Sequence, residues 1–281
     1  MRRFIFALIA VAAVGASAGA QQRLGQDVDT WRWNGRVDAG KWVRIYNLNG
    51  GIEFTASPDN QVHIIAEKNL RRGDARDVWF EVVQSSNGNL TVCAVFYEET
   101  SCEEDSYSTR NRHRDENRVS VDMQVQLPRN TRWMASSVNG GVSVRDGGEE
   151  VIAKSVNGGV TVANARGPVK ASTVNGGVSV TTSEGPVSAS TVNGSVTARM
   201  DKLSGDEDMN FSTVNGSVRV EVPRDFNADI RFDTMNGSIS SDFPIKLSGR
   251  FGPRHAEGTI GRGGRSIRAR SVNGSVVLRM L

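Results

Sequence analysis

The chain has 281 residues and carries 34 Lys and Arg against 31 Asp and Glu, for a net charge of +3. This length is enough for one large domain or two ordinary ones. Without Arg2 and Arg3 the balance falls to 32 against 31. A nearly neutral surface with both signs interspersed gives no reason to expect a nucleic acid or an acidic polymer as partner.

The first twenty residues have the layout of a secretory signal peptide. Arg2 and Arg3 precede an apolar run over residues 4–14, and Ala18-Gly19-Ala20 supplies a small-residue cleavage site. The paired arginines also fit the twin-arginine route. No later stretch approaches the roughly 20 apolar residues of a membrane-spanning helix. We therefore expect residues 1–20 to be removed, leaving an exported protein in the periplasm, on the cell surface or secreted.

Residues 21–127 form the less regular part of the chain. Short alternating apolar runs predict strands there, arranged either as irregular first coils or as a small β-sandwich cap. Cys93 and Cys102 are the only cysteines, and in an oxidising compartment they are expected to form a structural disulfide. A redox or metal pair is the alternative, but the C-x-x-C spacing is absent.

Residues 98–117 are highly polar and are expected to form a mobile surface loop. Within this loop, Arg110, Arg112 and Arg114 are candidates for contact with an anionic envelope group. Neighbouring acidic residues weaken their combined field, so a plain solvated loop is the alternative.

Residues 128–281 are dominated by a repeat. Asn-Gly recurs at Asn139, Asn157, Asn175 and Asn193, each 18 residues after the last, and again at Asn215, Asn236 and Asn273. Around these pairs the sequence is close to A-x-[ST]-V-N-G-[GS]-V-x-V. Each repeat holds two segments that alternate with a period of two, which predicts two short strands joined at a turn.

The near identity of successive repeats predicts an all-β, single-stranded β-solenoid with coils of roughly 18–22 residues, because like residues then stack on like. A meander of hairpins is the alternative. Stacking would place Val151, Val169 and Val187 in one inward column and Ala153, Ala171 and Ala189 in another. It would also place the Asn-Gly asparagines in a structural amide ladder at a corner, where Asn tolerates a left-handed turn.

A second column contains hydroxyl side chains, at Ser137, Ser155, Thr173, Thr191 and Thr213. Such an array resembles those of ice-binding solenoids, but the alternation places it on the inward face, which favours bonds to the backbone of a neighbouring coil. The sequence predicts no catalytic, cofactor-binding or metal-binding residue. A carbohydrate-active β-helix enzyme, a lyase or hydrolase, is the alternative function, and it requires carboxylates that converge from adjacent coils.

The repeated T-V-N-G-[GS]-V-x-V resembles a bacterial adhesin-like domain family of unknown function. The C-terminal pattern Gly258-Thr259-Ile260-Gly261, followed by Ser271-Val272-Asn273-Gly274, is similar to that of the family, and so is the cysteine pair. The resemblance covers roughly residues 40–281 and implies a repetitive β-solenoid with no catalytic residues.

We expect a non-catalytic, adhesin-like scaffold or binding module, with an envelope polysaccharide or another envelope protein as partner. The chain ends in the strand-like run 276–281, which contains a single charge, Arg279. An open strand edge at the end of a solenoid favours pairing, so we expect the C-terminal coil to pair with a second copy or to bind an envelope partner by strand addition. A short, twisted edge shielded by the polar turn around Arg262 is the alternative.

Overall fold

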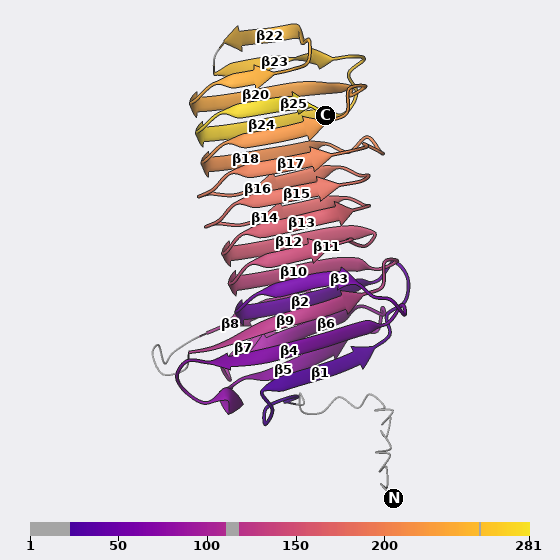
Figure 1. Ribbon diagram of the computed structural model, residues 1–281, viewed down its shortest axis with the longest axis vertical. Helices are drawn as coiled ribbons and strands as arrows, with labels where there is room; N and C mark the ends of the chain where they lie inside the picture. The colour runs from indigo at the N-terminus through magenta and orange to yellow at the C-terminus, as the bar shows by residue number, and fades with distance from the viewer. Residues whose placement is uncertain (1–22, 111–117, 253) are drawn as a thin grey trace, which may run out of the picture.

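The computed structural model describes residues 23–110, 118–252 and 254–281. It contains two long β-sheets that face each other along the whole length of the molecule (Figure 1). The only helix in the described residues is the short 3-10 helix Ala75–Asp77, and none is long and apolar enough to cross a membrane. The expected signal peptide, residues 1–20, lies outside the described residues.

Sheet A has twelve strands. From one end of the molecule to the other they are β22 (Lys246–Gly252), β23 (His255–Ile260), β20 (Ala228–Asn236), β24 (Ser266–Asn273), β18 (Met209–Asn215), β16 (Val187–Ser190), β14 (Val169–Ser172), β12 (Glu150–Asn157), β10 (Arg132–Asn139), β2 (Trp42–Asn49), β6 (Leu90–Val95) and β5 (Trp79–Gln84).

Sheet B has eleven strands. Beginning at the opposite end of the molecule, they are β1 (Thr30–Gly35), β4 (Val62–Leu70), β9 (Val119–Leu127), β3 (Ile52–Ala56), β11 (Val142–Arg145), β13 (Val160–Ala165), β15 (Val178–Thr182), β17 (Val196–Met200), β19 (Val218–Val222), β25 (Val276–Met280) and β21 (Ile239–Ser241). A separate hairpin pairs β7 (Thr100–Cys102) with β8 (Tyr107–Thr109).

The sequence repeats form the levels of a β-solenoid, which confirms the predicted fold. One level consists of a strand in sheet A and the next strand of the chain in sheet B, and successive levels pair in parallel. Val151 pairs with Val169 and Val169 with Val187, and the three alanines stack beside them in the same register. These side chains are buried, because alternate residues of each strand point into the space between the sheets.

The less regular N-terminal part continues the same stack. The level formed by β2 and β3 lies directly against β10 and β11, although Asn49 and Asn139 are 90 residues apart in sequence. The strands β6 and β9 form the next level, and β5, β4 and β1 then add on in antiparallel orientation. A single buried apolar cluster includes residues from both parts of the chain, from Trp31 to Leu278.

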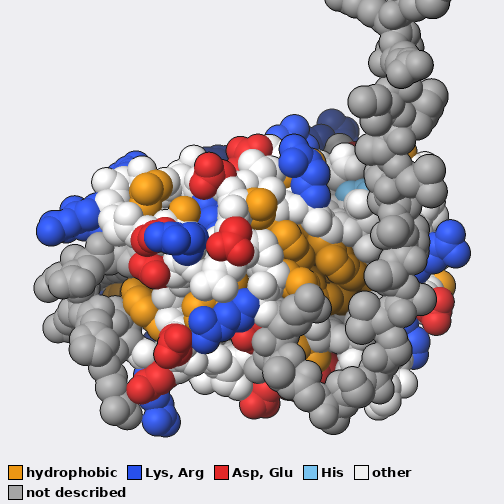
Figure 2. Space-filling model, turned by 90° about the horizontal axis from the view of Figure 1, so that it is seen from below, with side chains coloured by type: hydrophobic (Ala, Val, Ile, Leu, Met, Phe, Trp, Pro, Cys, Tyr) orange, Lys and Arg blue, Asp and Glu red, His pale blue; other side chains and the backbone are white. Residues whose placement is uncertain are grey.

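Aromatic side chains close the N-terminal end of the core. Trp31 stacks on Phe80 with ring centroids 4.4 Å apart, and Leu24 pairs with Phe80 through two backbone hydrogen bonds. Trp33 and Val82 pack against the core but remain partly exposed. Figure 2 views the molecule from this end and shows hydrophobic side chains gathered among charged ones.

The C-terminal end differs from the sequence-based expectation. β25 is paired on one side with β19 and on the other with β21, and β24 lies between β18 and β20. The last coil of the chain is therefore an inner level. The terminal level is formed by β20 and β21, and the antiparallel strands β23 and β22 extend sheet A beyond β20. The prediction of an open edge at residues 276–281, with self-association through it, is wrong because both edges of β25 are occupied.

Candidate functional site

A ladder of asparagine amides follows the corner where the chain passes from sheet A to sheet B. Each Nδ2 donates to the Oδ1 of the next asparagine at 2.8–2.9 Å. In spatial order the ladder contains Asn49, Asn139, Asn157, Asn175, Asn193, Asn215, Asn273 and Asn236. The sequence analysis did not include Asn49, whose level lies far away in sequence.

The asparagines at this corner do not have the left-handed backbone conformation that the sequence predicted. Among the described non-glycine residues, positive φ occurs only at Asn60, Asp146 and Asn164. The corner depends instead on the glycine after each ladder asparagine. A Cβ on Gly158 would lie 2.4 Å from the carbonyl oxygen of Gly140, and a Cβ on Gly176 equally close to that of Gly158. Glycine is required here because neighbouring levels touch through their backbones.

The hydroxyl column points inward, as predicted, and is structural. Ser155 Oγ donates to the carbonyl oxygen of Gly140 at 2.8 Å, and Thr173 Oγ1 to that of Gly158 at 2.7 Å. The same bond to a corner glycine recurs at Ser137, Thr191, Thr213, Ser271 and Thr234. These groups satisfy buried backbone acceptors, so they present no hydroxyl array to solvent.

A column of aliphatic side chains stands outside the core, beside the asparagine ladder. Val156, Val174, Val192 and Val214 are each 39% exposed, and Met235 is 57% exposed. Leu48, Val138 and Val272 occupy the same position at other levels and are partly exposed. We call these eight residues the valine stripe. The sequence indicated this outward orientation, because the valine of T-V-N-G directly follows an inward hydroxyl residue and successive side chains of a strand point to opposite faces.

The surroundings of the valine stripe are polar and uncharged over its central levels. Two residues before the valine, on the same outer face, lie Ser172, Ser190 and Ser212. The ladder asparagines flank the other side. Over these three levels the stripe is a narrow apolar ridge between neutral hydrogen-bonding groups, whereas Lys154, Arg270 and Asp233 occupy the same position beside Val156, Val272 and Met235.

A groove of about 430 Å³ crosses the outer face of sheet B next to the same corner. It spans the levels of β9, β3, β11 and β13. Its lining consists of Gly51, Ile52, Glu53, Asp122, Met123, Gln124, Gly141, Val142, Ser143, Gly159 and Thr161. We refer to it as the glycine groove, because glycine occupies the first position after the corner in three of its levels.

Both carboxylates of the glycine groove are already held by donors. Asp122 Oδ1 accepts the backbone N–H of Gly51 at 2.9 Å, and its Oδ2 accepts the amide of Asn69 at 2.9 Å. Glu53 forms an ion pair with Arg145 of the neighbouring level. The two acids are thus fixed in place as hydrogen-bond acceptors at one end of the groove.

A disulfide-linked hairpin covers the outer face of sheet A near its N-terminal end. Cys93 of β6 and Cys102 of β7 are bonded, and both are buried. Around them packs a second apolar cluster, separate from the main core and containing Tyr46, Trp79 and Val95. Tyr107 stacks on Tyr46 with centroids 5.7 Å apart and donates from its hydroxyl to the carbonyl of Ala94, while burial raises the pKa of its hydroxyl.

This hairpin corrects the expectation of a mobile loop over residues 98–117, at least for its described part. The reason is that Tyr107 and Cys102 provide buried anchors within a polar sequence. Arg110, one of the candidate anion contacts, is exposed immediately after β8. The other two, Arg112 and Arg114, lie outside the described residues, so the site remains a prediction.

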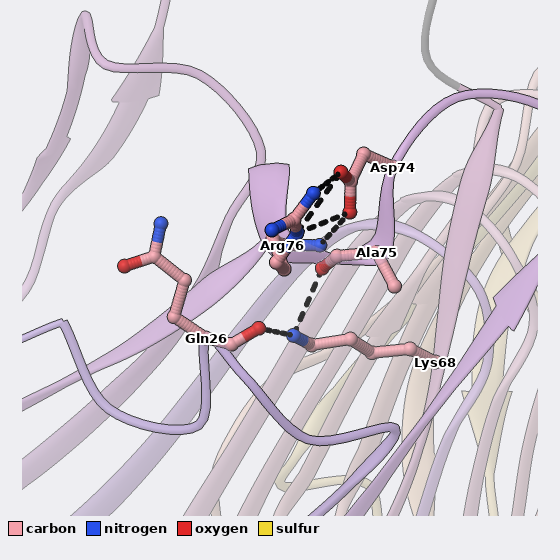
Figure 3. Close-up of polar contacts among 5 residues, drawn as sticks. All are labelled: Gln26, Lys68, Asp74, Ala75 and Arg76. Atoms are coloured by element: carbon pink, nitrogen blue, oxygen red, sulfur yellow. Dashed lines mark hydrogen bonds and ion pairs between the residues drawn. The ribbon is translucent and has the colours of Figure 1, made fainter.

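Lys68 joins three segments at the N-terminal end (Figure 3). Its ammonium donates to the carbonyl oxygens of Gly25, Gln26 and Ala75 at 2.8–3.0 Å. Burial lowers the pKa of Lys68, although nearby aspartates oppose the shift. Beside it, Arg76 binds Asp74 and lowers the pKa of that carboxyl to about 2. The three carbonyls satisfy all donors of the ammonium, which makes this cation a structural anchor.

The described residues contain no group of three or more His, Cys, Asp or Glu arranged to hold a metal ion. The chemistry that the described surface offers is hydrogen bonding in the glycine groove and apolar contact along the valine stripe.

Comparison with known proteins identifies the family. Two solved structures that resemble this fold are described as a "putative adhesin" from Bacteroides fragilis and a "putative cell adhesion protein" from Clostridium sporogenes. The first has 10% identity and a TM-score of 0.39, covering 90% of this chain and 97% of that one. The second has 10% identity and a TM-score of 0.35, covering 90% and 100%. No curated protein matched the chain. The model of the Toastrack DUF4097 family matches residues 82–279, which is more than half of the sequence, and the chain therefore belongs to the Toastrack DUF4097 family.

Proposed function

We propose that this protein is a non-catalytic, exported scaffold that binds the apolar face of another envelope protein along its valine stripe. The observation that carries the proposal is the stripe itself, an aliphatic column that is exposed at Met235 and at its four central valines and partly exposed at Leu48, Val138 and Val272. The signal-peptide pattern and the buried disulfide support export, because stable structural disulfides belong to oxidising compartments.

The stripe is suited to binding because it is preorganised. Valine has one strongly restricted χ1 torsion, so little side-chain entropy is lost on contact. At the levels of Val174, Val192 and Val214, neutral serines and asparagines on both sides favour an uncharged partner surface, since a charged one would lose hydration without finding a counter-charge. Cross-strand contacts between β-branched residues also stabilise a sheet modestly, so the test must separate binding from stability.

Threonine provides that separation, because it keeps the branch at Cβ and replaces one methyl by a hydroxyl. We expect the triple substitution Val156→Thr, Val174→Thr and Val192→Thr to lower binding to a detergent extract of the native envelope at least tenfold, with an unchanged melting temperature. The control is Ser179→Thr, an exposed position on the outer face of sheet B that belongs neither to the stripe nor to the groove. Equal binding of the triple variant and the wild type would contradict the proposal.

One observation favours the alternative, a carbohydrate-active enzyme. Glu53 and Asp122 come from adjacent levels and line the same groove, and glycoside hydrolysis uses a pair of carboxyl groups in one groove. The test is release of reducing ends from envelope polysaccharide. Release by the wild type that disappears in Glu53→Gln and in Asp122→Asn would establish the enzyme and remove the non-catalytic proposal.

A further inference from the structure

The glycine groove contains backbone donors that the rest of the stack satisfies internally. At the first position after the corner, Ser217 N–H donates to Ser195 Oγ at 3.2 Å, Ser275 N–H to Ser217 Oγ at 3.2 Å, and Ser238 N–H to Ser275 Oγ at 3.3 Å. At the other end, Gly51 N–H donates to Asp122 Oδ1. In each pair the acceptor is the side chain at the same position of the adjacent level.

Four levels in between lack that acceptor. On the adjacent level, the residue at the same position is a glycine, which has no side chain to accept a hydrogen bond. Within the described parts of the chain, no acceptor is found for the N–H groups of four residues, Gly141, Gly159, Gly177 and Ser195. Because successive levels of a sheet lie about 4.8 Å apart, these donors form a row with that repeat. The first two lie in the lining of the glycine groove.

The fold does not require glycine at this position. A Cβ on Gly141 would come no closer than 3.3 Å to another atom, and one on Gly159 no closer than 3.5 Å. Neither glycine has a positive φ. Serine occupies the equivalent position at residues 195, 217, 275 and 238. This differs from the preceding glycine of each corner, where a side chain has no room. The groove is therefore open, with its donors unpaired, for a reason other than backbone geometry.

We propose that the glycine groove binds one uncharged linear glycan chain, lying along the stack with its oxygens on the row of N–H groups. Sugar hydroxyls both donate and accept, which matches a lining that combines backbone N–H donors, the Asp122 and Glu53 acceptors, and the Ser143 and Thr161 hydroxyls, which can do either. The Asp122 carboxylate, whose bonded donors are neutral, repels an anionic polymer, whereas Arg145 compensates the charge of Glu53.

An extended peptide fits the row less well. A strand rises about 3.4 Å per residue, so carbonyl groups on one side recur about every 6.8 Å, whereas the donors recur about every 4.8 Å. A glycan offers several oxygens per sugar and can reach successive donors. The groove lies on the outer face of sheet B, and the asparagine corner separates it from the valine stripe on the outer face of sheet A. It is a different surface from the stripe, so this site goes beyond the proposed function.

The experiment titrates residues 21–281 with cellohexaose and chitohexaose, which are uncharged, with hexagalacturonate as the anionic probe, and with a Ser-Gly peptide of similar length. Calorimetry measures affinity, and ¹⁵N–¹H NMR follows the backbone amides. We expect an uncharged hexamer to bind and to shift the amide signals of Gly141, Gly159 and Gly177.

The decisive variant is Gly141→Ser with Gly159→Ser, which supplies the hydroxyl acceptors found at the other levels. We expect affinity for the uncharged hexamer to fall at least tenfold while the melting temperature stays unchanged. Ser217→Gly, the reverse change in the same column outside the groove, is expected to leave affinity unaltered.

Failure of both uncharged hexamers to bind, unchanged affinity in the double variant, or tighter binding of hexagalacturonate or the peptide would overturn the proposal. None of these substitutions changes a residue of the valine stripe. The glycan-binding proposal can therefore be disproved while the proposed function stands, and the reverse also holds.

Discussion

At the residue scale, the alternation of the repeat determines which side chains the solenoid can tolerate. Val178 is 2% exposed, whereas its neighbour Ser179 is exposed on the outer face of sheet B. Levels above and below present Thr161 and Thr197 beside Ser179, so no like charge is near in that column.

Two aspartate substitutions at adjacent positions should therefore differ sharply. Val178→Asp places a carboxylate without a partner in the core and is expected to lower the free energy of unfolding by about 3 kcal/mol or more. Ser179→Asp remains solvated and should change it by less than about 0.5 kcal/mol. Urea unfolding of both variants gives the comparison, and similar losses would show that the assignment of faces is incorrect.

The inward and outward columns of residues 128–222 could be predicted because an 18-residue spacing fixes which residues stack. The N-terminal levels could not be, since β2 and β3 stack on strands that follow them by about ninety residues, and no regular spacing connects the Asn-Gly pair at Asn49 with the pair at Asn139. The glycine groove was also missed. Its free donors become visible only when the hydrogen bonds of the serine levels are compared with those of the glycine levels.

At the element scale, the hairpin of β7 and β8 is attached to the solenoid as a separate unit. Its apolar cluster is distinct from the main core, and it is held by the disulfide, by the Tyr46–Tyr107 stack and by the bond from Thr91 Oγ1 to the carbonyl of Glu104. Local opening of such a unit need not involve the sheets beneath it.

Replacing both cysteines by alanine should therefore loosen the hairpin and leave the β-solenoid folded. Closure of a loop of this length contributes about 3 kcal/mol in the chain-entropy description. We expect trypsin to cleave Cys93→Ala/Cys102→Ala at Arg110 at least tenfold faster than the wild type, with little change in the far-ultraviolet circular dichroism. Ser101→Ala, on the same strand, is the control. Unaltered cleavage at Arg110 would mean that packing alone holds the hairpin.

At the scale of the whole molecule, the levels are not interchangeable. The repeats from residue 151 to residue 200 stack on neighbours adjacent in sequence, so each contacts nearly identical surfaces. The level of β24 and β25, by contrast, joins two levels that are consecutive in the chain but not in space. Its removal separates the terminal level from the remainder of the stack.

Two deletions of similar length should thus have opposite results. Deleting residues 169–186 removes one repeat and brings Val151 next to Val187, which preserves the inward valine column. A shorter, folded solenoid is therefore expected. Deleting residues 266–281 leaves β20 to β23 without their partner strand. Limited proteolysis should then digest residues 223–260 rapidly. Equal resistance of both deletion variants would contradict the assigned order of levels.

The inner position of the last coil also has a kinetic consequence for a chain that folds progressively from its N-terminus. The levels from β10 to β19 can add one after another as they emerge, each on a level that is already complete. The segment from residue 223 to residue 260 emerges next but has no template. Its strand β20 pairs with β24, which emerges later. Completion of this end must wait for release of the whole chain, and until then β18 and β19 present unpaired edges open to non-native pairing. A chaperone that covers these edges would act during that interval, and slower emergence of the chain would lengthen it.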